Sequence, residues 1–270
     1  MTELTVSVPA LSDFSQSRSA LEIAGMGPRV PTIEILWDNY CALDPVQLAD
    51  DLATLGDRLM IHIMWSRFIE LDDAAFADYL VRLRRHVQVL RPIAVSDHLC
   101  HFQFDGYFVA AGQEYSYERF DHVRERVARY QDAIGQTLLI ENGASLEEPA
   151  EKQIAYMHQL VERTGCGILF DVSNAVAGEL NGKGTIDLWL PLLAGRSLRC
   201  HVGSYTHDLD TDQFIDSHDA DVSTDTERAL RKLIAAPGID IASITYERDF
   251  NRSSEAIARD VARIRECLCG

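Results

Sequence analysis

Residues 164–175, TGCGILFDVSNA, contain a unit that recurs along the chain. The helical pattern EPAEKQIAYMHQLVERT (148–164) comes before it and is expected to end at Gly165, because glycine commonly terminates helices. The apolar run GILFD (167–171) then leads into polar residues. A run that is apolar at nearly every position, instead of at alternate ones, is typical of a parallel strand buried on both faces. This stretch therefore predicts a helix followed by a strand of a parallel α/β fold.

Apolar runs of this kind recur along the chain, and helical patterns separate them. One helix is expected to begin at Asp44-Pro45 and to end at Gly56, and another to run from about Tyr117 to Gly135. Eight units in 270 residues give about 34 residues per unit, close to the ~31 of a typical (β/α)8 barrel. The predicted strands cover residues 4–8, 32–37, 59–64, 92–97, 137–141, 167–171, 197–202 and 243–247.

The count favours an α/β fold of the TIM-barrel type, a single (β/α)8 domain over residues 1–270. The alternative is a doubly wound open sheet, which usually has a glycine-rich turn after its first strand. Here the first strand continues into VPALSDFS (8–15) without such a turn. In a barrel, the active site is expected at the C-terminal rim of the strands.

The composition is that of an ordinary globular protein, with 47% hydrophobic and 25% charged residues. The formal net charge of −17 argues against a nucleic-acid partner and against binding to an anionic membrane. The N-terminal sequence does not have the pattern of a signal peptide, and no apolar run approaches the ~20 residues that span a bilayer. We therefore expect a cytoplasmic protein with reduced cysteines. Cys267 and Cys269 are expected to lie in a frayed terminus.

Polar side chains stand at the C-terminal ends of the last six predicted strands and in the loop after the seventh. Each has an ordinary explanation by itself. His62 can be a hydrogen-bonded core histidine, Glu141 and Asp171 can cap a loop or a helix, and a charged loop can simply be solvated. The nine candidate residues are His62, His98, Glu141, Asp171, Asn174, His201, Asp216, His218 and Glu247. The histidines on helices or other loops stay outside this set: His86, His101, His122, His158 and His207.

Together the nine residues indicate a metal site. Buried ionisable groups are costly unless they are paired or bind a metal, and several carboxylates in one cleft repel each other unless cations lie between them. One ion takes about six such ligands, so nine donors predict two or three ions bridged by carboxylates. No cysteine completes a tetrahedral sulfur site, which argues against structural zinc. Mixed imidazole and carboxylate donors favour iron or manganese, with zinc left open.

Eight fragments of the sequence stand out together: HIMWSRFIE (62–70), RPIAVSDHL (91–99), FDHVRERV (120–127), LLIENGAS (138–145), GCGILFDVSNA (165–175), CHVGSY (200–205), SHD (217–219) and ITYERDF (244–250). In these fragments the chain resembles the DUF692 family of multinuclear non-haem iron-dependent oxidative enzymes, and within it the methanobactin-biosynthesis (MbnB-like) branch. The likeness covers residues from about 30 to 250, nearly the whole chain. Each fragment is weak alone, and their combination is specific.

The resemblance implies a TIM barrel whose rim binds two or three irons of mixed Fe(II)/Fe(III) state, with O2 as co-substrate. It also implies that the nine candidate residues are the ligands and that Asp249, in the fragment ERDF, accepts a proton near the substrate. Among this chain's cysteines, only Cys200 beside His201 is expected near the metals, as a small core residue. The thiolate on the metal is therefore expected to come from the substrate.

The activity that the resemblance implies is oxidation of cysteine in a ribosomally made precursor peptide (MbnA-like) to an oxazolone and a neighbouring thioamide, which together bind copper. A small partner protein (MbnC-like) is expected to present the peptide. One alternative is another chemistry on a metal-dependent barrel, either sugar isomerisation or epimerisation or endonuclease IV-like hydrolysis. The acidic charge weighs against DNA as a substrate. Another alternative is a non-catalytic metal-binding scaffold.

Overall fold

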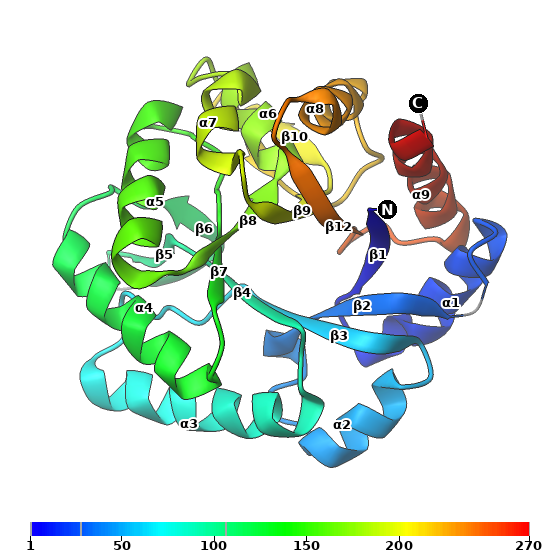
Figure 1. Ribbon diagram of the computed structural model, residues 1–270, viewed down its shortest axis with the longest axis horizontal. Helices are drawn as coiled ribbons and strands as arrows, with labels where there is room; N and C mark the ends of the chain where they lie inside the picture. The colour runs from blue at the N-terminus through cyan, green and yellow to red at the C-terminus, as the bar shows by residue number, and fades with distance from the viewer. Residues whose placement is uncertain (1, 28, 106, 270) are drawn as a thin grey trace.

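The computed structural model describes residues 2–27, 29–105 and 107–269. Eight parallel strands close into a barrel in the order β1-β12-β9-β8-β7-β4-β3-β2, and Figure 1 shows this ring with the helices outside it. The TIM-barrel prediction is therefore confirmed. The barrel strands are β1 (Glu3–Val8), β2 (Val30–Leu36), β3 (Gly56–Ile63), β4 (Ala94–His98), β7 (Leu138–Glu141), β8 (Gly167–Asp171), β9 (Ser197–Val202) and β12 (Asp240–Tyr246).

Helices connect the strands and cover the outside of the barrel (Figure 1). The last of them, α9, packs beside α1, so both ends of the described chain lie on neighbouring parts of the barrel wall. No helix in the described ranges is long and apolar enough to cross a membrane. The helices are α1 (Phe14–Ile23), α2 (Pro45–Leu52), α3 (Asp73–Leu90), α4 (Phe120–Ile134), α5 (Ala150–Thr164), α6 (Val172–Leu180), α7 (Leu190–Leu193), α8 (Thr224–Ala235) and α9 (Ser254–Cys269). Short 3₁₀ helices are η1 (Leu11–Asp13), η2 (Trp37–Asn39) and η3 (Ile186–Leu188).

Two β-hairpins extend the rim. One follows β4 and consists of β5 (Cys100–Phe104) and β6 (Tyr107–Glu114), and the other follows β9 and consists of β10 (Tyr205–Asp208) and β11 (Gln213–Asp216). Neither hairpin was predicted from the sequence, because β5, β10 and β11 are short and largely exposed or half-buried. They matter for function because they stand directly over the C-terminal strand ends.

The predicted helix ends agree with the structure in two cases and fail in one. Helices α4 and α5 end at Gly135 and Gly165, which adopt φ of 69° and 68°, a conformation that glycine reaches without strain. Helix α2, in contrast, ends at Leu52, and Gly56 is the first residue of β3. A Cβ on Gly56 would lie 3.0 Å from the Ile33 side chain. This glycine therefore permits close approach of β3 to β2.

The expectation of a frayed C-terminus is wrong. Helix α9 continues to Cys269, and Cys267 is buried with 3% exposure against the core. The end of the chain is held because α9 is amphipathic and buries Val261, Ile264 and Cys267 against its neighbours.

Candidate metal centre

The structure brings the nine candidate side chains together at the C-terminal rim of the barrel. Six of them are buried, and His98, Asp216 and His218 are half-buried. They come from different elements: His62 from β3, His98 from β4, Glu141 from β7, Asp171 from β8, Asn174 from α6, His201 from β9, Asp216 from β11, His218 from the loop after β11, and Glu247 from the residue after β12.

Glu141 lies between two groups of donor atoms. Its Oε2 is 3.4 Å from Nε2 of His62 and 3.4 Å from Nε2 of His98. Those two nitrogens are themselves 3.0 Å apart. Its Oε1 faces the other way, 3.3 Å from Nδ1 of His201. One carboxylate thus reaches both groups, which is the geometry of a bridging ligand.

The second group consists of Glu141, Asp171, His201 and Glu247, whose ligand atoms lie within 4.8 Å of one another. The first group, with His62 and His98 around Glu141, meets the same limit. In the second group, Oε2 of Glu247 is 2.8 Å from Nδ1 of His201. Mixed oxygen and imidazole donors at these separations suit a divalent transition metal.

His218 and Asp216 extend the cluster. Nε2 of His218 lies 2.7 Å from Oδ1 of Asp216 and 3.7 Å from Oε2 of Glu247. His218 itself has φ of 49°, a conformation that costs a non-glycine residue energy and is common at functional sites. Its ring packs on Gly203, where a Cβ would lie 2.6 Å from Cδ2 of the imidazole. Glycine at position 203 therefore leaves the space that this histidine occupies.

Many of these buried atoms make no well-directed hydrogen bond within the described residues, although some lie 2.7–2.8 Å from another charged group of the cluster or from Glu34. An unpaired buried polar atom costs roughly 1–3 kcal/mol. A cluster that contains this many of them is hard to explain without a bound cation. The donor set fits a metal on this ground. The atoms are Oε1 and Oε2 of Glu141, Oδ2 of Asp171, Oδ1 of Asn174, Nδ1 and Nε2 of His201, Oδ1 of Asp216, Nε2 of His218 and Oε2 of Glu247.

The electrostatics lead to the same conclusion. Burial, together with the negative charges of Asp216 and Glu141, raises the pKa of Asp171 well above its usual range. Burial raises the pKa of Glu247 to about 7. Burial alone would lower the pKa of His201, yet the surrounding carboxylates raise it well above the ordinary value. A bound cation relieves this carboxylate repulsion and keeps the acids ionised.

Asp171 and His62 have the ordinary structural roles that the sequence allowed, and they also contribute atoms to the metal cluster. Oδ1 of Asp171 accepts a hydrogen bond from the backbone N–H of Asn174 at 2.6 Å and caps α6, while Oδ2 is left without a partner in the described chain. His62 uses Nδ1 for a 2.9 Å hydrogen bond with Ser96, while Nε2 points into the cluster. Asn142 bonds both backbone groups of Asp171, at 2.8 and 3.0 Å, and holds the strand end in place.

Two residues of the site escaped the sequence analysis. Glu34 of β2 is buried with 2% exposure, and its carboxylate contacts His201. The sequence feature that could have identified Glu34 is its position as a charged residue inside the apolar run TIEIL (32–36). Cys100 lines the same cavity as His98, so the expectation that only Cys200 lies near the metals was incomplete. Burial raises the pKa of the Cys100 thiol well above its usual range, which disfavours the thiolate.

Cys200 is 1% exposed, and burial raises its pKa to about 12, in agreement with a core role. Asp249 lies at the edge of the cluster, with Oδ2 3.3 Å from Nδ1 of His218. Its side chain also lines a cavity that reaches the metal ligands. The excluded histidines bond elsewhere: His86 to the Arg82 carbonyl and His122 to the Ile69 carbonyl, for example.

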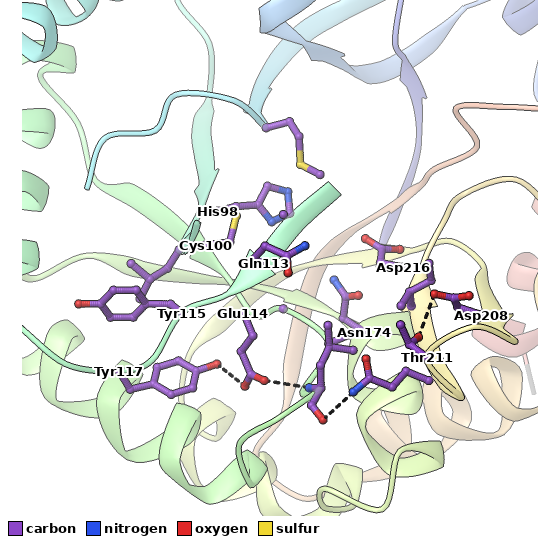
Figure 2. A pocket seen from close by; sticks show the side chains of 18 residues that line it. His98, Cys100, Gln113, Glu114, Tyr115, Tyr117, Asn174, Asp208, Thr211 and Asp216 are labelled. Carbon is purple, nitrogen blue, oxygen red and sulfur yellow. Dashed lines mark hydrogen bonds between the residues drawn. The ribbon is translucent and has the colours of Figure 1, made fainter. Parts of the chain in front are cut away.

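Two cavities open onto the cluster. One, of about 280 Å³, lies between the two rim hairpins and is lined by His98, Asn174 and Asp216 (Figure 2). The other, of about 500 Å³, is lined by His62, His218 and Glu247, among others. Within the described part of the chain, neither lining includes a lysine or an arginine. A polyanionic substrate such as DNA needs such groups, so the cavities weigh against the nuclease alternative.

Comparison with known proteins places this geometry in a family context. A family model described as "RiPP precursor modification enzyme MbnB/TglH/ChrH" matches residues 20–269; RiPPs are ribosomally synthesised and post-translationally modified peptides. A UPF0276 protein of Rhizorhabdus wittichii is 30% identical over 195 residues, which cover 68% of this chain and 69% of the relative. A UPF0276 protein of Caulobacter vibrioides is 30% identical over 196 residues, covering 70% and 69%.

Solved structures share the fold at lower identity. An L-ribulose 3-epimerase has a TM-score of 0.61 at 19% identity, over 99% of this chain and 94% of that one. A xylose isomerase-like TIM-barrel protein from Mycobacterium smegmatis, in complex with magnesium, has a TM-score of 0.64 at 13% identity, covering 99% and 97%. Endonuclease IV from Thermus thermophilus has a TM-score of 0.57 at 16% identity, covering 98% of each chain. Likeness at these identities extends to the barrel alone.

Proposed function

Since this chain belongs to the MbnB/TglH/ChrH family of RiPP precursor modification enzymes, we propose that it oxidises a cysteine residue of a ribosomally synthesised precursor peptide. In the proposal, the enzyme uses two or three iron ions and O2. It converts the cysteine and the neighbouring amide to an oxazolone and a thioamide, the groups of a methanobactin-type copper chelator. The hydrogens removed from the peptide appear in water formed from O2.

The observation that carries the proposal is the position of Glu141 between two imidazole groups. Its two oxygens face His62 and His98 on one side and His201 on the other. This arrangement supports at least two ions bridged by one carboxylate, and the mixed donors suit iron. Bound iron would supply the binding of a substrate thiolate and the redox chemistry with O2.

The chain's own residues hold and orient the reactants. Asn142 and Ser96 fix Asp171 and His62 by hydrogen bonds of 2.8 to 3.0 Å. Asp249 lies in the wall of the larger cavity and is assigned the role of proton acceptor. Strand-borne ligands of this kind keep the site in one geometry, which lowers the cost of reaching the reactive arrangement.

A small MbnC-like partner is part of the proposal. Both cavities are open at the rim, and a flexible peptide that is held by a partner loses less entropy when it binds the catalyst. The tip of the β5–β6 hairpin supports such an interaction, because Phe104, Tyr107 and Phe108 are 71%, 74% and 55% exposed. Exposed aromatic groups of this kind mark interaction surfaces. Coexpression followed by size-exclusion chromatography tests for a stable complex, and separate elution at micromolar concentration would count against it.

We also propose a cytoplasmic location. In the described part of the chain, all six cysteines are free thiols, as is usual in a reducing compartment.

The decisive experiment uses the metal-loaded protein and a cysteine-containing precursor peptide from its genomic neighbourhood. Without oxygen, the peptide should produce a thiolate-to-iron charge-transfer band. Admission of O2 should bleach that band and give a lighter peptide, with O2 consumed. The control is the same peptide with serine in place of cysteine, which should show neither step because an alcohol is not held deprotonated as a thiol is. Normal reaction of the serine peptide would contradict the proposal and favour a sugar or hydrolase chemistry.

A further inference from the structure

The metal cluster lies between two cavities and not at the bottom of one. Met64, His98 and Asp216 line both the cavity of about 280 Å³ between the hairpins and the cavity of about 500 Å³ on the other side. A molecule bound at the ligands can therefore extend in two directions. This is the shape expected for a chain that crosses the site, and a small sugar would need only one of the two spaces.

The two cavities differ in chemistry. Beside the metal ligands and Asp249, the lining of the larger one includes the large apolar groups Leu36, Trp65 and Phe250. Its wall is held in place, because the Asp38 carboxylate accepts hydrogen bonds from the backbone N–H groups of Met64 and Trp65 at 2.8 and 3.2 Å. The pocket is thus formed before any ligand arrives, which lowers the entropy cost of filling it.

The smaller cavity mixes apolar side chains, such as Leu99 and Ile215, with polar groups that are tied together by hydrogen bonds (Figure 2). Tyr117 donates to Oε1 of Glu114 at 3.1 Å, and Oε2 of Glu114 accepts from the backbone N–H of Leu146 at 2.9 Å. On the opposite wall, Thr211 donates to Asp208 at 2.8 Å. A large apolar side chain placed against Glu114 or Asp208 would displace water from these groups without replacing its hydrogen bonds, which is unfavourable.

The volume of the larger cavity sets what it can hold. A dry apolar cavity of ~150 Å³ is enough to bind benzene, and the larger cavity is about 500 Å³. It can therefore take a whole aromatic or large aliphatic side chain together with part of a peptide backbone. Burial of such a side chain against Trp65 and Phe250 would be worth about ten-fold in affinity or more.

We propose that the substrate peptide crosses the metal centre in an extended conformation and places a large apolar residue, adjacent to the reacting residue on one side only, in the cavity walled by Trp65 and Phe250. The residue on the other side lies in the smaller cavity between the hairpins. This inference rests on the proposed function, because it takes the substrate to be a peptide. The inference defines the substrate specificity of the enzyme: the peptide needs a large apolar residue on one side of the reacting residue, and no apolar residue on the other side.

Calorimetric titration of short synthetic peptides into the metal-loaded protein under anaerobic conditions tests the inference. Each peptide carries one cysteine among glycines, with phenylalanine directly before it, directly after it, or absent. We expect phenylalanine in one of the two positions, and not in the other, to tighten binding about ten-fold. Trp65→Ala should remove that preference, and Trp65→Phe should retain most of it.

The matched control is Leu209→Ala, because Leu209 is 82% exposed on the turn of the other hairpin and lines neither cavity. That variant should keep the full preference. Equal affinities for the three peptides, equal gains at both positions, or a preference that survives Trp65→Ala would overturn the inference. Mass spectrometry of the same peptides after admission of O2 separates the two proposals. A binding preference with no change in mass contradicts the proposed function alone, and modification of all three peptides at equal rates contradicts the specificity alone.

Discussion

The two ring nitrogens of His201 each face a carboxylate. Nε2 lies 2.8 Å from Oε1 of Glu34, and Nδ1, on the other side of the ring, lies 2.8 Å from Oε2 of Glu247. A carboxylate behind one ring nitrogen holds the proton there and leaves the lone pair of the other nitrogen free for a metal. Glu34 comes from β2, and His201 from β9, so the pair spans the interior of the barrel. The contact assigns Nδ1 of His201 to the metal side.

The first prediction follows from this pair. Glu34→Gln should weaken metal affinity on the order of 10- to 100-fold, because the amide cannot replace the carboxylate behind His201. Competition with a chelator of known affinity measures the effect. Glu22→Gln is the control, since Glu22 is exposed on α1. An affinity equal to that of the unmodified protein would remove Glu34 from this role.

The second prediction concerns the proposed bridging residue. Glu141→Ala should lose most of the bound metal, because both of its oxygens face ligand nitrogens of different groups. Elemental analysis of the purified variant measures the metal per chain. Cys200→Ser changes a buried residue next to His201 without removing a donor and should keep the metal. Full occupancy in Glu141→Ala would show that it is no ligand.

A third prediction uses the space beside His218. Gly203→Ala should displace the imidazole, because a Cβ at this position would lie 2.6 Å from Cδ2 and 3.0 Å from Nε2. We expect reduced metal content with the fold retained, measured by elemental analysis and circular dichroism. Gly143→Ala is a matched control, since nothing lies within 4 Å of a Cβ built there. Unchanged metal content in Gly203→Ala would mean that His218 moves away without consequence and is not a ligand.

Removal of the metal gives a fourth prediction. The cluster places Glu141, Asp171 and Glu247 within 4.8 Å at their ligand atoms, so loss of the cations leaves their repulsion unopposed. Binding at 100 times the dissociation constant stabilises a native protein by about 2.7 kcal/mol, which for a chain of this size corresponds to roughly 5–10 °C in Tm. Chelation should lower the Tm by this order, and added Fe(II) should restore it. The Glu141→Ala variant should respond much less, and a chelator-insensitive Tm in the unmodified protein would contradict the site.

The barrel and most of the cluster could be predicted from the sequence because their signals are local. An apolar run such as GILFD (167–171) marks a buried strand, and the polar residue at its end marks the rim. Asp171 and His98 could therefore be placed near each other without any long-range information, since all strand ends of a parallel barrel meet at one rim.

What could not be predicted depends on contacts across the barrel. Glu34 lies in the middle of a strand, and nothing in its neighbours shows that it faces His201. Cys100 begins a hairpin whose first strand, CHFQF (100–104), is short and alternates apolar with polar residues. Gly56 was expected to close a helix, yet it serves the packing of β3 on Ile33. In each case the partner is distant in sequence, and a single sequence does not specify distant pairs.

The last prediction concerns Asp249. Its Oδ2 is 3.3 Å from Nδ1 of His218, and its backbone N–H donates to the His218 carbonyl at 2.9 Å. The side chain therefore has two roles to separate: it lines the substrate cavity as a proton acceptor, and it orients a ligand. Asp249→Asn keeps the shape and can still contact His218, but it removes the base. We expect full metal content and an intact charge-transfer band with the cysteine peptide, followed by oxidation slowed by about 10²-fold or more. Stopped-flow absorbance after admission of O2, with elemental analysis of the same sample, measures both. Loss of metal in Asp249→Asn would show that its main role is to hold His218, and an unchanged oxidation rate would show that the proton goes elsewhere.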